Sequence, residues 1–488
     1  MKRGALSLLL LVLALGICQK ARAETRVKMR GDAFIMANYF QNHNYTGWNK
    51  TGTKTEDTFE IWERFRLRAD FEANKSVYFR LGLRIINTWG QGTFTAANPA
   101  AEVLVDVAYL QFKWPDTDIE ITAGYQALEL PQNAIFNSSV IYSDLVAALT
   151  VRAPLLPDTL SVLAGFGRFF DSNRTYDNNT TQASDEFDAY FLALPVTLEG
   201  FKATPWGMIG VAGRNATYTY KNTADVPEIG NSYDNALFSA ASIANMNTAN
   251  GMGRWKNSQN PYFWAGGSLE VAALDPVRFY ADVIYGQGAM SDSKAAKRRG
   301  WMVDFAAQYT GLSVVTPQVF AFWSTGEDNS TANGSERLPY LRSQWGPGRS
   351  FLFESGQDLP RDTSTYTTPV GIYGFGASLN DISFMEKLSN RATFVYVQGN
   401  NSPRAIRAAR LLNASYMTMG HDLSRNEHLL GFNVDTKYSL YENLDVILQT
   451  GWAHGQFQES VWGHRLVSQA ESNGNNIWLL ALGFSYKF

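Results

Sequence analysis

The amino-acid sequence predicts an all-β protein that crosses a membrane as one antiparallel up-and-down β-barrel. Three observations predict this fold class. The final segment is a strand with a wholly apolar face, similar alternating segments precede it, and short turns alternate with long polar connections. The mean hydropathy is slightly negative. This is expected of a barrel, because only alternate residues of each strand face lipid.

The last strand carries the clearest signal. Every second residue from Trp478 to Phe488 is large and apolar, and a period of two is that of a β-strand. The edge of a soluble sheet with so many aromatic residues would aggregate, whereas a closed barrel turns the same face to lipid and has no edge. The last strand of a soluble sandwich is the alternative. An aromatic terminal residue such as Phe488 is what outer-membrane barrels present to their assembly machinery, so we expect that machinery as a partner.

The N-terminus predicts export. Lys2 and Arg3 precede an apolar stretch from Ala5 to Cys18, and Ala21-Arg22-Ala23 fits a cleavage site. We therefore expect residues 1–23 to be a signal peptide and residues 24–488 to be a single barrel domain of 488 minus 23, or 465, residues. The only cysteine lies in the predicted signal, so disulfides and cysteine–metal sites are not expected in the mature chain.

The net charge argues against a nucleic-acid partner. The formal charge is -3, and the predicted signal removes four cations, Lys2, Arg3, Lys20 and Arg22, which leaves -3 minus 4, or -7. An acidic chain of this kind lacks the basic footprint of a nucleic-acid-binding protein.

The alternating segments predict about 18 strands, or 16 if one weak pair is misassigned. The first three lie near 27–38, 59–72 and 77–85. The others lie near 103–114, 119–129, 140–153, 159–169, 186–197, 201–217, 260–273, 277–288, 298–310, 313–325, 367–379, 389–399, 427–440, 443–455 and 475–488. Short turns rich in Pro, Gly, Asp and Asn alternate with long connections. We expect the short turns on the periplasmic side and the long connections outside.

Five arginines on the first clear hairpin are the leading site candidates. Arg64, Arg66 and Arg68 are two residues apart and share a face, and Arg80 and Arg84 follow the same pattern on the next strand. Arginine facing lipid near the midplane would cost about 2–4 kcal/mol, so all five are expected to face the lumen. Two roles remain open. The arginines select anions, or they pair with nearby acids and brace the wall.

The connection from Ala127 to Ser139 is the candidate for a constriction. If it folds into the lumen, Glu129, Gln132 and Asn133 are expected to face the arginines and to create a transverse field. An ordinary external loop is the alternative.

Enzyme chemistry has little support in the sequence. The five histidines are His43, His421, His428, His454 and His464, and none lies two residues from a serine on a predicted strand. We expect no catalytic residue, no metal site and no cofactor.

Several short segments carry a resemblance that covers essentially the whole mature chain. These are Gly124-Tyr125-Gln126, Asp275-Pro276, Arg298-Arg299-Gly300-Trp301, Ser335-Glu336-Arg337-Leu338-Pro339 and the terminal aromatic strand. With them the chain resembles the homotrimeric outer-membrane porins of sulfate-reducing bacteria. The resemblance implies a homotrimeric, water-filled diffusion channel without catalytic residues, and it implies no particular solute.

Together these observations predict an outer-membrane porin for passive diffusion of small hydrophilic solutes and ions, with a possible preference for anions. Its surroundings would be outer-membrane lipid and lipopolysaccharide. A substrate-specific channel with a saturable site for an anion or an acidic sugar is the alternative. A barrel that acts as an adhesin or an enzyme is a third hypothesis.

Overall fold

The computed structural model shows a closed antiparallel β-barrel. It describes residues 25–488 except 49–53, 55–56, 90–101, 172–183, 217, 219–235, 245, 248–251, 254–256, 355–357, 360–363 and 413–415. The predicted signal peptide therefore lies outside the described residues. Each wall strand pairs with its neighbour in the chain, and β21 closes the barrel on β1. The short strands β8 and β9 both pair with β7 and β10 and therefore occupy one position in the wall. The 19 strand segments of the sheet thus form a barrel of 18 strands.

The prediction of 18 strands is confirmed, and the alternative of 16 is not needed. The wall strands are β1 (Arg26–Gln41), β2 (Asp57–Asn74), β3 (Val77–Thr88), β4 (Glu102–Lys113), β5 (Glu120–Glu129), β6 (Ser143–Leu156), β7 (Leu160–Asp171), β8 (Glu186–Ala193), β9 (Val196–Leu198), β10 (Phe201–Gly213), β13 (Gln259–Val271), β14 (Val277–Ala289), β15 (Lys297–Tyr309), β16 (Thr316–Ser324), β17 (Ile372–Ile382), β18 (Leu388–Gly399), β19 (His428–Tyr441), β20 (Leu444–Gln456) and β21 (Asn476–Lys487).

The connections contain the remaining elements. The helices are α3 (Ala240–Ala244), α4 (Pro403–Leu412), α5 (Glu459–Trp462) and α6 (His464–Ser472). The short 3-10 turns are η1 (Ala134–Phe136), η4 (Lys294–Ala296) and η5 (Pro347–Arg349), and β11 (Met246–Asn247) pairs with β12 (Met252–Gly253). Among the described residues, no helix is both long and apolar enough to cross a membrane.

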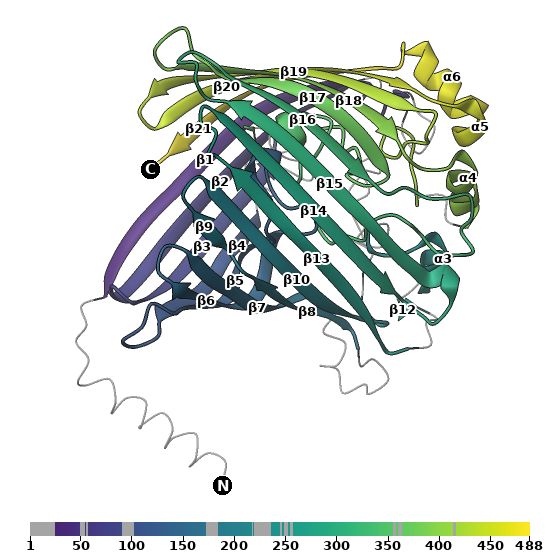
Figure 1. Cartoon of the computed structure of the whole chain (residues 1–488). Helices are drawn as coiled ribbons and strands as arrows, with labels where there is room; N and C mark the ends of the chain where they lie inside the picture. Colours follow the sequence, from purple (N-terminus) through teal and green to yellow (C-terminus); the bar gives the residue numbers. More distant parts are fainter. Residues whose placement is uncertain are drawn as a thin grey trace.

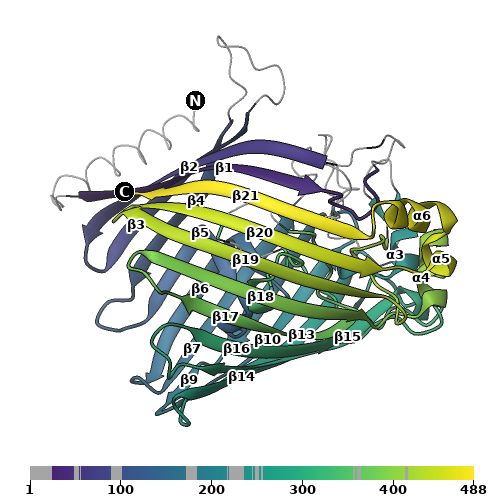
Figure 2. The ribbon, with the colours of Figure 1, turned by 90° about the horizontal axis from the view of Figure 1, so that it is seen from above.

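The long and the short connections gather at opposite ends of the barrel. Helices α4, α5 and α6 lie at one end, and the C-terminus lies at the other end with the short turns (Figures 1 and 2). This arrangement follows from an up-and-down meander, because every second connection returns to the same end. We call the end with the long connections the loop end, and the other the turn end.

The period of two along each strand separates an outer face from an inner face. On β15 the residues Lys297, Arg299, Trp301, Val303 and Phe305 are exposed, while the residues between them, from Arg298 to Ala306, are buried. The apolar residues Trp478 to Phe488 of β21 are exposed in the same way. The outer surface is therefore a nearly continuous apolar band of the kind that lipid covers.

The inner space is partly filled by two connections that turn back into the barrel. One is the connection Leu130–Tyr142 between β5 and β6, which we call the constriction loop. The other is 325–371, between β16 and β17, which we call the inner loop. The two run side by side, since Leu341 N donates to Ile141 O at 2.9 Å and Gly346 N donates to Phe136 O at 2.9 Å. Phe136 and Trp345 stack between them and are almost fully buried.

A glycine marks the point where the chain turns inward. Gly124 has a φ of +131°, and a Cβ there would collide with the carbonyl oxygen of Ala108. Pairing of β5 with β4 ends at Tyr125, whereas pairing of β5 with β6 continues to Glu129. The outer part of β5 therefore leaves β4 and leads into the constriction loop.

Candidate functional site

The five predicted arginines all lie on the inner face of β2 and β3 and pair with three aspartates from β1, β2 and β4. Arg64 and Arg66 share Asp32, with N–O distances of 3.1 and 2.7 Å. Arg68 and Arg84 approach Asp106 at 3.0 and 3.9 Å. Arg80 binds Asp70 through two nitrogens, at 2.5 and 2.8 Å. We call these eight residues the arginine wall.

The arginine wall carries more positive than negative charge. A sixth arginine, Arg30 of β1, also reaches Asp70 at 3.1 Å, and when it is counted with the five wall arginines, six arginines share three aspartates. The five wall arginines are 14 to 34 % exposed although they point into the barrel. Water therefore reaches the guanidinium groups from inside, and the excess positive charge faces that water.

The constriction loop crosses to the opposite side of the barrel. The two aspartates that anchor it belong to β14 and β15, and seven wall strands separate these strands from β2 and β3 in each direction around the barrel. Gln132 Nε2 donates to Asp304 at 2.7 Å, and the backbone and side-chain nitrogens of Asn133 donate to Asp282 at 3.0 to 3.2 Å. The loop thus folds into the lumen and is anchored to the far wall.

The prediction that Gln132 and Asn133 face the arginines is wrong. Their amide groups bind the carboxylates of β14 and β15, which accept hydrogen bonds, while the arginines already have their own aspartates. Asn133 is buried and does not line an open space. Glu129, the last residue of β5, is exposed, and its position opposite the arginines stays a prediction.

Asp282 and Asp304 form the anchor point. They are direct cross-strand partners, and both are almost fully buried. Asp304 also accepts a hydrogen bond from Trp345 Nε1 of the inner loop at 2.9 Å. One pair of acids therefore holds both inward-folded connections.

The inner loop continues along the wall from β16 to β1. The backbone carbonyl of Gly348 accepts a hydrogen bond from Thr393 at 2.7 Å, and Arg391 joins Asp358 of the loop to Asp435 of β19 at 3.2 and 2.7 Å. The remaining water-accessible space is therefore bounded by the arginine wall on one side and by loop segments on the other.

Charged residues of the inner loop and of β6 pair with each other close to the end of β5. Arg342 of the inner loop pairs with Glu354 at 2.6 Å and with Asp144 at 3.5 Å. The hydroxyl of Tyr125 interacts electrostatically with Asp144 and also with Arg84 and Asp106 of the arginine wall. Tyr125 therefore lies within electrostatic range of both the arginine wall and Asp144.

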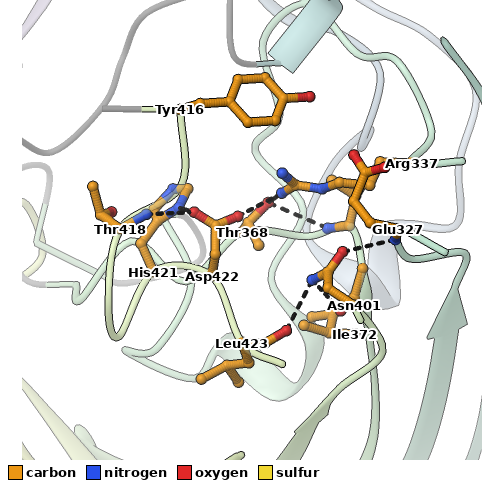
Figure 3. Close-up of polar contacts among 12 residues, drawn as sticks. Glu327, Arg337, Thr368, Ile372, Asn401, Tyr416, Thr418, His421, Asp422 and Leu423 are labelled. Atoms are coloured by element: carbon orange, nitrogen blue, oxygen red, sulfur yellow. Dashed lines mark hydrogen bonds and ion pairs between the residues drawn. The ribbon is translucent and has the colours of Figure 1, made fainter. Parts of the chain in front are cut away.

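A buried polar network ties together the connections at the loop end, and we call it the outer cap (Figure 3). Arg337 and Asp422 form an ion pair of 2.6 Å with both side chains almost fully buried, and Arg337 also donates to Thr368 at 3.2 Å. Asp422 further accepts from Thr418 N and contacts His421 Nδ1, both at 3.0 Å. Burial would by itself raise the pKa of Asp422, but Arg337 and His421 outweigh this and lower it to about 2.

The outer cap joins two of the segments that carry the resemblance described above, Arg298–Trp301 and Ser335–Pro339. Arg298 at the start of β15 has no exposed surface, and it donates to the backbone carbonyls of Arg337 and Leu338 at 3.3 and 3.1 Å. Ser335 N also donates to Lys297 O at 2.8 Å. The two segments thus hold the inner loop against the rim of the barrel.

The histidines have structural surroundings. His43 contacts the backbone carbonyl of Ser364 at 3.3 Å, and His454 contacts Asn476 at 3.1 Å. His464 lies on an exposed helix, where Glu459 approaches its Nδ1 at 3.3 Å and Ser468 Oγ lies 3.3 Å from Nδ1 and 3.4 Å from Nε2.

The closed wall, the inward-folded loops and the charged inner face define a porin-like β-barrel. Among solved structures, the chain is similar to the Pseudomonas aeruginosa protein OpdO, with a TM-score of 0.52, 11 % identity, and 95 % of this chain and 97 % of that one covered. It is similar to the P. aeruginosa outer membrane protein OpdK, with a TM-score of 0.52, 10 % identity, and coverage of 94 % and 98 %. At this identity the likeness shows the fold alone. Scans of protein-family models and of curated proteins find no match.

Proposed function

We propose that this protein is an outer-membrane channel for passive diffusion of small hydrophilic solutes and ions, with a preference for anions. The carrying observation is the arginine wall, where six arginines share three aspartates and remain in contact with water inside a closed barrel. Arginine stays charged at any working pH, so this wall attracts anions and repels cations throughout that pH range.

The inward-folded loops support a narrowed rather than a wide pore. The constriction loop and the inner loop are pinned to the wall opposite the arginines, so a solute passing them is forced close to the guanidinium groups. At short range in a narrow, low-dielectric space, a fixed charge acts more strongly than it would in bulk water.

A second candidate is a substrate-specific channel for an anion or an acidic sugar. The observation that favours it is the ion pair of Arg342 in the inner loop with Asp144 of β6 at 3.5 Å, with Tyr125 of the neighbouring strand within electrostatic range of Asp144 and Arg84. The carboxylate of an acidic sugar would bind the arginines, and its hydroxyl groups would bind Tyr125 and Asp144, so the sugar would be held from two sides. Saturable block of ion current by a hexuronate separates this candidate from a general porin, because a diffusion channel without a site does not saturate.

The first test is the reversal potential of the purified protein in a planar bilayer across a KCl gradient. We expect steady conductance with anion preference. A cation preference would contradict the role of the arginines, and an absence of conductance would contradict the channel itself.

The second test replaces Arg64, Arg66 and Arg68 together with serine. We expect the permeability ratio to shift toward cations, because three of the six guanidinium groups are removed while the aspartates remain. The control is the double variant Lys75→Ser and Lys387→Ser, which removes exposed cations from two short turns. An unchanged ratio in the triple variant would leave the arginines as wall braces only.

The setting of the protein is part of the proposal. We infer a location in the outer membrane, with the turn end in the periplasm and the loop end outside, after removal of residues 1–23. The homotrimer, assembly through the C-terminal strand and contact with lipopolysaccharide are likewise predictions. Sedimentation in detergent, and conductance in steps of three, test the trimer.

A further inference from the structure

Three cations lie on the outside of the barrel at the loop end. Lys297 and Arg299 belong to the exposed face of β15, and Lys294 lies in η4 just before it. Their exposure is set by the register of the strand, since the alternate residues Arg298 and Gly300 are buried. Among the described residues, none of the three cations forms an ion pair within 4 Å. Glu336 interacts with Arg299 electrostatically at longer range.

The residues next to these cations form two shelves on the barrel exterior. Gln287 is the exposed cross-strand partner of Arg299 and accepts a hydrogen bond from the Tyr285 hydroxyl at 2.9 Å, so the upper shelf is polar. Below it Tyr285 and Trp301 lie with ring centroids 4.6 Å apart. A strand rises about 3.3 Å per residue, so Arg299 lies about 7 Å and Lys297 about 13 Å beyond Trp301 along the strand.

The order of these groups along β15, from apolar residues through aromatic rings to cations, matches the order of groups in a phosphorylated lipid. Trp and Tyr settle at the boundary between acyl chains and head groups. Below Trp301, β15 exposes Val303 and Phe305, which suit acyl chains. Above it, arginine and lysine are the side chains that bind phosphate, and a guanidinium binds it through two hydrogen bonds.

Another exterior cation at the same end, Arg168, differs because its charge is already paired within the chain. Arg168 of β7 is exposed, but it binds Asp188 through two nitrogens at 2.9 Å and Asp171 at 3.0 Å. Its charge is used within the chain. On β15 the corresponding charges lack such partners and are available to an external anion.

We propose that Lys294, Lys297 and Arg299, above the Tyr285–Trp301 shelf, bind the phosphate groups of a phosphorylated glycolipid of the outer leaflet, the lipid A part of lipopolysaccharide. This inference rests on the outer-membrane location in the proposed function, but it does not depend on conductance. The glycolipid's sugars fit the polar shelf at Gln287, and its acyl chains fit the apolar strand face below.

The test measures binding of bis-phosphorylated lipid A to the detergent-solubilised full-length protein by native mass spectrometry. We expect the double variant Lys297→Gln and Arg299→Gln to bind at least about tenfold more weakly than wild type, since it loses two charge-assisted contacts. Arg168→Gln is the matched control and should bind like wild type. Raising KCl should weaken wild-type binding, because exposed charges are screened.

Three outcomes would overturn the proposal. Equal binding by the double variant would place the lipid elsewhere, and equal binding of dephosphorylated lipid A would leave acyl adsorption alone. Equal binding of phosphatidylglycerol would remove the preference for a glycolipid. Heat-modifiability on gels verifies that each variant is folded. Conductance is recorded in parallel, so a silent wild type would contradict the channel without touching the lipid site.

Discussion

The arginine wall and the outer cap both use arginine and aspartate, but they use them differently. In the outer cap Arg337 and Asp422 are matched one to one, and their side chains are 3 and 2 % exposed. In the arginine wall six arginines compete for three aspartates, and the five wall arginines are 14 to 34 % exposed. A dry, balanced pair fixes structure, whereas a wet wall with surplus charge leaves a field for solutes. The predictions below test this division.

The largest effect is expected in the outer cap. Arg337→Ala leaves Asp422 buried without its cation, and breaking a buried pair costs about 3–5 kcal/mol. We expect the connection 400–427 to become sensitive to protease while the barrel remains heat-modifiable.

The matched control for that variant is Arg349→Ala in the same inner loop. Arg349 pairs with Asp358 at 3.2 Å but is 47 % exposed, and exposed pairs contribute only about 0–1 kcal/mol. Equal protease sensitivity in the two variants would contradict the distinction between dry and wet pairs.

The next effect concerns the anchor of the two inward-folded loops. Asp304→Ala removes the acceptor of Gln132 and Trp345, and each buried donor left unpaired costs about 1–3 kcal/mol. We expect a larger and noisier single-channel conductance. Asp304→Asn keeps an acceptor oxygen and should stay close to wild type. An unchanged conductance in the alanine variant would show that the loops are held without this residue.

A smaller effect is expected from acid. The pKa of Asp422 is lowered to about 2, so its ionised form stabilises the cap above the ordinary pKa of 3.8, and this contribution disappears as the pH falls toward 2. A shift of this size corresponds to about 2 kcal/mol. Hydrogen exchange of residues 416–424 should therefore accelerate between roughly pH 4 and pH 2. The Asp422→Asn variant should lack this acceleration, and a wild type without it would contradict the assignment.

The smallest structural effect is expected within the arginine wall. Arg84 approaches Asp106 only at 3.9 Å, so Arg84→Gln should change stability by less than about 1 kcal/mol and yet reduce anion preference. Arg80→Gln breaks the two-nitrogen contact with Asp70 and should cost more stability for a similar loss of charge. If Arg84→Gln left the permeability ratio unchanged, the charge of that residue would be irrelevant to the pore.

The barrel was predictable because a half-buried strand repeats its environment every two residues. The alternation of Phe65 and Leu67 with Arg66 and Arg68 directly predicts which residues lie on each face of β2. The ion-pair partners of the arginines were harder to predict from the sequence. Asp70 lies next to them in sequence, but the pairing of Asp32 and Asp106 with them depends on the register of β1 and β4.

The loops mark the limit of the sequence argument. The tendency of the connection after β5 to enter the lumen was expected, but its destination was not. Asp282 and Asp304 appear in the sequence as ordinary polar residues of an inner face. Only the closure of the 18-stranded barrel places them opposite the arginine wall and within reach of Gln132 and Asn133.

The sequence by itself determined the strands, their two faces and the end-to-end alternation of turns and loops, because those properties follow from local periodicity and turn chemistry. The tertiary structure decided which charges meet, which stay wet, and where the long connections bind. These depend on contacts between residues far apart in the chain, from 32 positions for Asp32 and Arg64 to 149 positions for Asn133 and Asp282, and no local pattern encodes such contacts.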